Sequence, residues 1–110
     1  MTKAIKVAHL RDIPPGSMKT FNILNHEILI MNFDGILYAL EARCPHKNYP
    51  LKLGSLMGRV LKCGFHYAEF DVPSGKILSQ PIGNSRPIKN LKKYNIKVEN
   101  SEVFVEISNS

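Results

Sequence analysis

Cys44-Pro45-His46 and Cys63-Gly64-Phe65-His66 are the two stretches that decide how this sequence is interpreted. The first is a Cys-x-His pair and the second is a Cys-x-x-His pair, and sixteen residues separate them. The chain has two cysteines and four histidines, so both cysteines and half of the histidines lie here. Thiolate and neutral imidazole are both good ligands for iron and zinc. The pattern therefore predicts one metal site, with four ligands: Cys44, His46, Cys63 and His66.

Each stretch carries one cysteine and one histidine, and this pattern resembles the Rieske iron–sulfur family. In that family two cysteines hold one iron of a [2Fe–2S] cluster and two histidines hold the other. A tetrahedral Cys2His2 zinc site is the main alternative, and it would make the chain a zinc-stabilised binding module. A disulfide and a pair of buried apolar thiols are further alternatives, but both leave the matched histidines unexplained.

The resemblance extends over most of the chain, from about Phe33 to Ile107. The first loop of the family often reads Cys-Pro-His-x-Gly-x-x-Leu, and here Asn48 stands at the glycine. Asn tolerates left-handed backbone better than most residues, so we expect the turn to persist. The second loop often reads Cys-Pro-x-His-Gly-x-x-Phe-Asp, and here Gly64 and Tyr67 depart from the common residues.

Short apolar runs separated by turn residues predict an all-β chain without a long helix. Asp34-Gly35 is a strong hairpin signal, and Asn100-Ser101 marks another turn. Tyr94, Ile96 and Val98 alternate with polar residues, which predicts one strand with a single buried face. The other expected strands are Ala4–Leu10, Lys19–Leu24, Glu27–Phe33, Ile36–Leu40, a hairpin within Gly54–Lys62, Phe70–Val72, Lys76–Leu78, and the run Val103, Val105, Ile107.

The strand pattern alone indicates only a small all-β sandwich or barrel. The resemblance adds antiparallel β-sheets of the Rieske type, with a cluster-binding subdomain inserted into a base domain. We expect residues 1–110 to form a single domain and the insertion to cover about residues 42–80. Pro81 and Ile82 lie where the family has a proline-containing loop over the cluster.

The resemblance implies a one-electron carrier that holds one [2Fe–2S] cluster and catalyses no reaction itself. The respiratory cytochrome bc type has a disulfide between its loops, but here those positions are Tyr49 and Phe65. That type also has a serine two residues after the second histidine, where this chain has Ala68. We expect a soluble ferredoxin acting between a reductase and a terminal oxygenase, with the small subunit of an assimilatory nitrite reductase as the alternative.

The composition is that of an ordinary globular protein, with 44% hydrophobic and 22% charged residues. No membrane span, signal peptide or nucleic-acid recognition motif is evident, so we expect a cytoplasmic protein that binds neither membranes nor nucleic acid. The formal charge is +6, from 15 basic and 9 acidic residues. Basic residues lie in or beside the two loops, and they are either scattered solvated surface charge or a rim that would steer an acidic redox partner. They are Arg43, Lys47, Lys52, Arg59 and Lys62.

Overall fold

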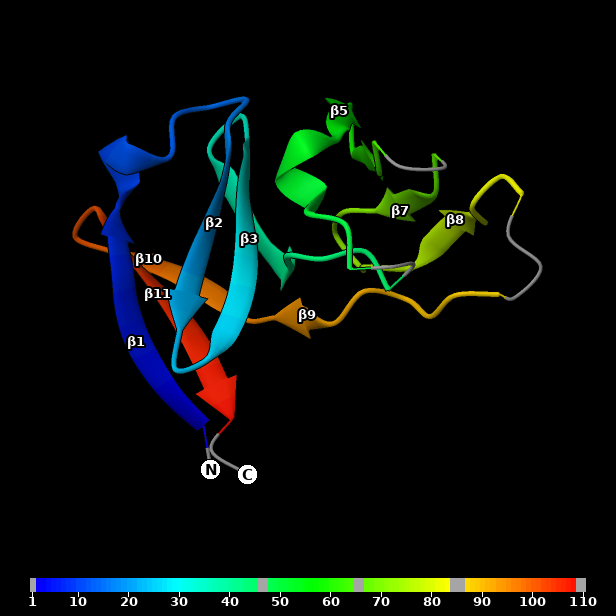
Figure 1. The fold of residues 1–110 in the computed structure, drawn as a ribbon. Coiled ribbons are helices and arrows are strands. Elements are labelled where there is room, and N and C mark those ends of the chain that lie inside the picture. The colour runs from blue at the N-terminus through cyan, green and yellow to red at the C-terminus, as the bar shows by residue number, and fades with distance from the viewer. Residues whose placement is uncertain (1, 46–47, 65–66, 84–86, 109–110) are drawn as a thin grey trace.

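The chain forms three antiparallel sheets in a computed structural model that describes residues 2–45, 48–64, 67–83 and 87–108 (Figure 1). Their strand orders are β1-β11-β10, β2-β3-β4-β9 and β5-β6-β7-β8. The elements are β1 (Thr2–His9), η1 (Leu10–Asp12), β2 (Met18–Ile23), β3 (His26–Phe33), β4 (Ile36–Glu41), η2 (Leu51–Leu53), β5 (Ser55–Met57), β6 (Val60–Lys62), β7 (Glu69–Asp71), β8 (Ile77–Ser79), β9 (Lys93–Tyr94), β10 (Ile96–Glu99) and β11 (Glu102–Ser108).

The expected all-β architecture is confirmed. Among the described residues the two helices are single 3-10 turns of three residues each, η1 and η2. No helix in this part of the chain has the length and apolar character needed to cross a membrane. Leu10, expected to end the first strand, instead begins η1, whose N-cap is His9.

Strand β3 contributes side chains to both halves of the molecule. Ile28 and Ile30 belong to a core cluster with Val103 and Val105 of β11, while Leu29 and Met31 belong to the cluster that contains both cysteines. Successive side chains of a strand point to opposite faces, so β3 supplies both cores at once. This explains why residues 28–31 form an unbroken apolar run instead of an alternating one.

The sheet β5-β6-β7-β8 lies between β4 and β9 along the chain and is shown on the right of Figure 1. Its short strands follow the register Leu56↔Leu61 and Leu61↔Phe70. Fully buried Leu61 and Phe70 pack toward the cluster of Leu29 and Met31. The third sheet therefore packs on one face of β3 and β4, and β11 packs on the opposite face.

The expected single strand through Tyr94, Ile96 and Val98 is wrong. Tyr94 lies in β9 and pairs with Ala39 of β4, whereas Ile96 begins β10 and pairs with β11. The chain therefore changes sheet at Asn95, whose carbonyl accepts a hydrogen bond from the Glu106 N–H over 2.9 Å. Val98 is 42% exposed and lies on β10, an edge strand of its sheet.

Candidate metal centre

The two cysteine loops have the same backbone closure. The Cys44 N–H donates to the Tyr49 carbonyl over 2.8 Å, and the Cys63 N–H donates to the Ala68 carbonyl over 2.8 Å. In both loops the acceptor is the fifth residue after the cysteine. The loops also begin alike, since Cys44 follows β4 closely and Cys63 comes directly after β6. Two equivalent turns therefore each present one cysteine at the same position.

Each loop turns at a left-handed residue that is not glycine. Asn48 has φ +55° and Tyr67 has φ +60°, and each is the fourth residue after its cysteine. The expectation that Asn48 can replace glycine is confirmed by this conformation. Tyrosine rarely adopts left-handed backbone, which costs roughly 1–2 kcal/mol outside glycine. Such strain persists only where surrounding contacts impose it, and it is typical of functional loops.

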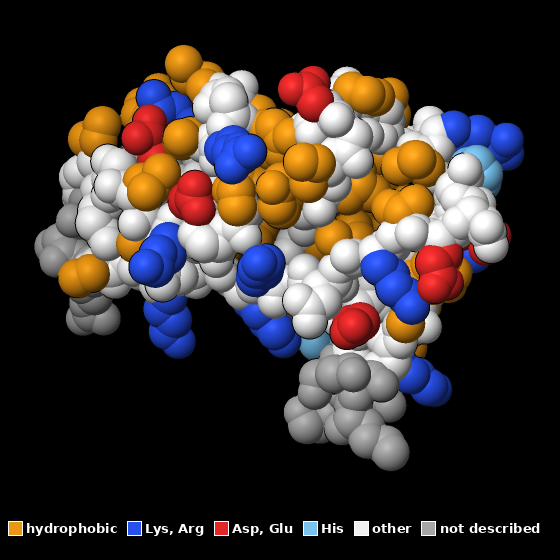
Figure 2. Space-filling view, turned by 180° about the vertical axis from the view of Figure 1, so that it is seen from behind, with side chains coloured by type: hydrophobic (Ala, Val, Ile, Leu, Met, Phe, Trp, Pro, Cys, Tyr) orange, Lys and Arg blue, Asp and Glu red, His pale blue; other side chains and the backbone are white. Residues whose placement is uncertain are grey.

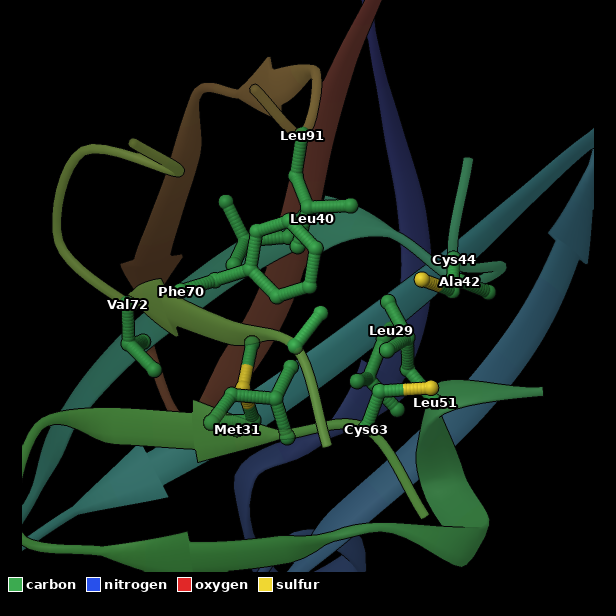
Figure 3. Close-up of a cluster of buried hydrophobic side chains, with 12 residues drawn as sticks. Leu29, Met31, Leu40, Ala42, Cys44, Leu51, Cys63, Phe70, Val72 and Leu91 are labelled. Carbon is green, nitrogen blue, oxygen red and sulfur yellow. The ribbon is translucent and has the colours of Figure 1, made fainter. Parts of the chain in front are cut away.

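Both cysteines are fully buried in one apolar cluster, although they come from loops far apart in the sequence. Figure 3 shows their sulfurs on the same side of this cluster, beside Leu29 and Leu51. Both are cysteines and not halves of a cystine, so the disulfide alternative is not supported. Two buried thiols brought together from matched turns fit the cysteine half of an iron–sulfur site.

The histidine half of the predicted site cannot be placed, because His46 and His66 lie outside the described residues. Within the described ranges, no three His, Cys, Asp or Glu residues gather as a metal site would require. Pro81, next to the third sheet, is buried, whereas Ile82 is 67% exposed.

The sequence did not predict that the cations preceding the cysteines are engaged in ion pairs. Arg43 Nε lies 2.9 Å from Glu27 Oε1, and Lys62 Nζ lies 3.6 Å from Glu69 Oε2. The second pair follows from the register, which places Lys62 opposite Glu69. No comparable sequence signal links Arg43 to Glu27, which lie sixteen residues apart.

Among the basic residues near the loops that the structure describes, Arg43 and Lys62 are thus paired with carboxylates. Figure 2 shows Lys and Arg side chains scattered over the visible face, with no single patch. Lys52 and Arg59 are exposed, and no ion pair is recorded for either within the described part of the chain. Lys47 lies outside that part.

The other two histidines, His9 and His26, lie outside both loops and make structural contacts. His9 is the N-cap of η1. Its side-chain Nδ1 accepts a hydrogen bond from the Arg11 backbone N–H, and its backbone N–H donates to the Asp12 carboxylate. His26 Nδ1 lies 3.2 Å from the Tyr94 hydroxyl, with the rings edge to face. Burial raises the pKa of Tyr94, and the carboxylate of Glu41 raises it further.

Comparison with known proteins identifies the family. The model of the Rieske [2Fe-2S] domain matches residues 3–100. The ferredoxin component of the naphthalene 1,2-dioxygenase system of Pseudomonas putida is 31% identical, over 96% of this chain and 97% of that protein.

Solved structures of dioxygenase ferredoxins have a similar fold. The ferredoxin of carbazole 1,9a-dioxygenase from Nocardioides aromaticivorans has a TM-score of 0.84 at 23% identity, and the match covers 94% of this chain and 96% of that one. A structure described as a complex of reduced oxygenase and oxidised ferredoxin in carbazole 1,9a-dioxygenase matches with a TM-score of 0.79 at 27% identity. That match covers 93% of this chain and 91% of the other. The chain belongs to the Rieske [2Fe-2S] family, and within it to the ferredoxins, which carry electrons and catalyse no reaction themselves.

Proposed function

We propose that Cys44, His46, Cys63 and His66 hold one [2Fe–2S] cluster, within a cluster-binding part that covers about residues 42–80. The observation that supports this most is the matched closure of the two loops, each with a buried cysteine at the same position. When bound, such a cluster accepts and gives up one electron. The family match disfavours a zinc-stabilised module.

The residues around the cysteines set the conditions for that chemistry. Leu29, Leu51 and Ala68 belong to the same buried apolar cluster as both cysteines, which are inaccessible to solvent. Two thiolates and two neutral imidazoles give the oxidised centre no net charge, two negative charges fewer than four thiolates would give. Reduction is therefore easier than in a four-cysteine site.

The physiological role that follows is electron transfer from a reductase to the terminal oxygenase of a ring-hydroxylating system, in the cytoplasm. The relative from Pseudomonas putida is a component of a dioxygenase system, and a solved relative is described in complex with its oxygenase. These relatives favour an oxygenase ferredoxin over the small subunit of a nitrite reductase.

Ligation is tested by replacing Cys44 or Cys63 with serine and His46 or His66 with alanine. Wild-type protein made with ample iron should contain about two irons and two acid-labile sulfides per chain. Each replacement should remove the normal rhombic paramagnetic resonance signal of the reduced protein. His26→Gln is the matched control, because His26 lies outside both loops, and it should retain the signal. One tightly bound zinc without sulfide would overturn the proposal.

The electron-transfer role is tested by reconstitution with a dioxygenase reductase and oxygenase. The wild-type protein should couple oxidation of the reductase to product formation, and the Cys63→Ser variant should not. Rapid coupling to a nitrite reductase, with none to any oxygenase tested, would support the alternative role.

A further inference from the structure

Arg43, the residue directly before Cys44, contacts two separate parts of the molecule at once. Its Nε lies 2.9 and 3.1 Å from the two carboxylate oxygens of Glu27 on β3. Its Nη1 donates over 2.9 Å to the carbonyl of Asn48, at the left-handed turn of the first loop. One side chain thus links the end of the loop to a strand of the base sheet.

Glu27 is itself well anchored. Glu27 lies opposite Asn22 in the register of the β2–β3 hairpin, and its backbone carbonyl accepts a hydrogen bond from the Ala42 N–H over 3.1 Å. The chain just before Cys44 is therefore attached to Glu27 through both backbone and side chain. Because β3 contributes side chains to both cores, Glu27 lies on a well-packed strand to which the Arg43 side chain is attached.

The geometry requires arginine specifically. The guanidinium presents several donors in a planar fork, so it can bind a carboxylate and a carbonyl at the same time. A lysine would keep the charge, but its compact ammonium lacks that fork. The second loop shows a looser version, in which Lys62 contacts Glu69 and lies 5.7 Å from the centre of the Tyr67 ring.

The arrangement contributes little to global stability. The side chains of Arg43 and Glu27 are 43% and 41% exposed, and exposed ion pairs contribute only about 0–1 kcal/mol. A contact of this kind therefore has its main effect locally, on the loop whose carbonyl it binds.

We propose that Arg43 is a positioning residue for the first cluster loop. Anchored on Glu27, it holds Asn48 in its left-handed conformation and thereby holds the turn that carries Cys44 and His46. This inference rests on the proposed cluster, and it adds a residue outside the ligand set to the site.

The experiment compares Arg43→Lys and Arg43→Gln with the wild type. Three quantities are measured: the melting temperature, the g-values and line widths of the reduced protein, and the rate at which the visible colour is lost in the presence of a chelator. Lys6→Gln is the matched control, since Lys6 forms an exposed ion pair of the same kind with Glu102 on the β1–β11 sheet.

Both Arg43 variants should broaden the resonance lines and speed colour loss by about three- to tenfold, the factor for one lost hydrogen bond. Melting temperatures should stay close to wild type, and Lys6→Gln should change none of the three quantities. A normal Arg43→Lys protein would show that only the charge matters and would overturn the inference, as would an unaltered Arg43→Gln protein. A wild-type protein without the cluster would instead overturn the proposed function.

Discussion

Tyr49 of the first loop lies directly against Gly64 of the second. A Cβ atom on residue 64 would stand 3.4 Å from both Cε1 and the hydroxyl of Tyr49, and 3.2 Å from the Leu53 carbonyl. The two loops thus meet where residue 64 has little room for a side chain. At this point the ring of Tyr49 therefore faces the backbone of Gly64.

Gly64→Ala should therefore destabilise the pairing of the two loops. We expect a loss of about 1–3 kcal/mol, the usual cost of overpacking, measured as a lower melting temperature and faster loss of colour. Adding Tyr49→Leu removes the ring atoms that the new methyl meets, so the double variant should lose less than the sum of the single losses. Strict additivity would mean that Tyr49 and residue 64 do not interact.

Gly75→Ala should be more severe. Gly75 has φ +77°, and an added Cβ would lie 2.5 Å from the Leu91 carbonyl oxygen. This clash is with backbone, so it cannot be relieved by a change of side-chain rotamer. The Gly75 carbonyl also accepts from the Leu91 N–H, so this turn attaches the third sheet to the segment before β9. We expect a loss of more than about 2 kcal/mol, or no folded protein.

The matched control for that change is Gly16→Ala. Gly16 has a similar φ of +84°, but an added Cβ would meet nothing within 4 Å. It should lose only about 1 kcal/mol, from backbone strain alone. Equal losses at the two positions would show that the contact with Leu91 is unimportant.

The reduction potential should lie at the low end of the Rieske range, roughly −150 mV. Ala68 is fully buried, and its methyl group cannot donate the hydrogen bond that serine gives in the respiratory type. Ala68→Ser should raise the midpoint, by about 40 mV for a new bond of about 1 kcal/mol. Protein-film voltammetry at neutral pH measures both values. A wild-type midpoint above about +150 mV would contradict the assignment.

Stability should fall at alkaline pH because of Tyr94. The folded pKa of Tyr94 is raised by burial and by Glu41, so above the ordinary tyrosine pKa of about 10 the unfolded chain loses the proton first. The contribution of neutral Tyr94 to the free energy of unfolding is complete below about pH 10, and it is lost as the pH rises toward the folded pKa. Tyr94→Phe should flatten this decline, measured as the denaturation midpoint between about pH 8 and 11. Parallel curves for the two proteins would exclude Tyr94 as the cause.

Electron transfer should depend more on Lys52 and Arg59 than on Arg43 or Lys62. The latter two already face Glu27 and Glu69, whereas Lys52 and Arg59 are exposed and have no recorded ion pair among the described residues. Reversing Lys52 and Arg59 to glutamate should slow transfer at low salt, and added salt should reduce the difference, since screening acts within about 8 Å at physiological ionic strength. Lys3→Glu, on β1, is the control. A rate indifferent to salt and to these changes would leave the basic residues without a role in docking.

The sequence alone was enough to predict the family of this protein and most of its strands. Two Cys/His pairs in matched loops predicted the family, which the comparison confirmed. The turns at Asp34 and Asn100 were predictable because Asp and Asn tolerate left-handed backbone, and both residues adopt it. The alternation of Val103, Val105 and Ile107 likewise predicted a buried face, and all three are buried.

Only the tertiary structure decided how distant segments meet. An alternating pattern records which residues of a strand are apolar but not which sheet the strand joins, so the change of sheet at Asn95 was not predictable. The contact of Arg43 with Glu27 and that of Tyr49 with Gly64 likewise depend on which strands the fold brings together. Local sequence sets the conformations available to each loop, whereas the packing of three sheets on a shared strand sets which loops face each other.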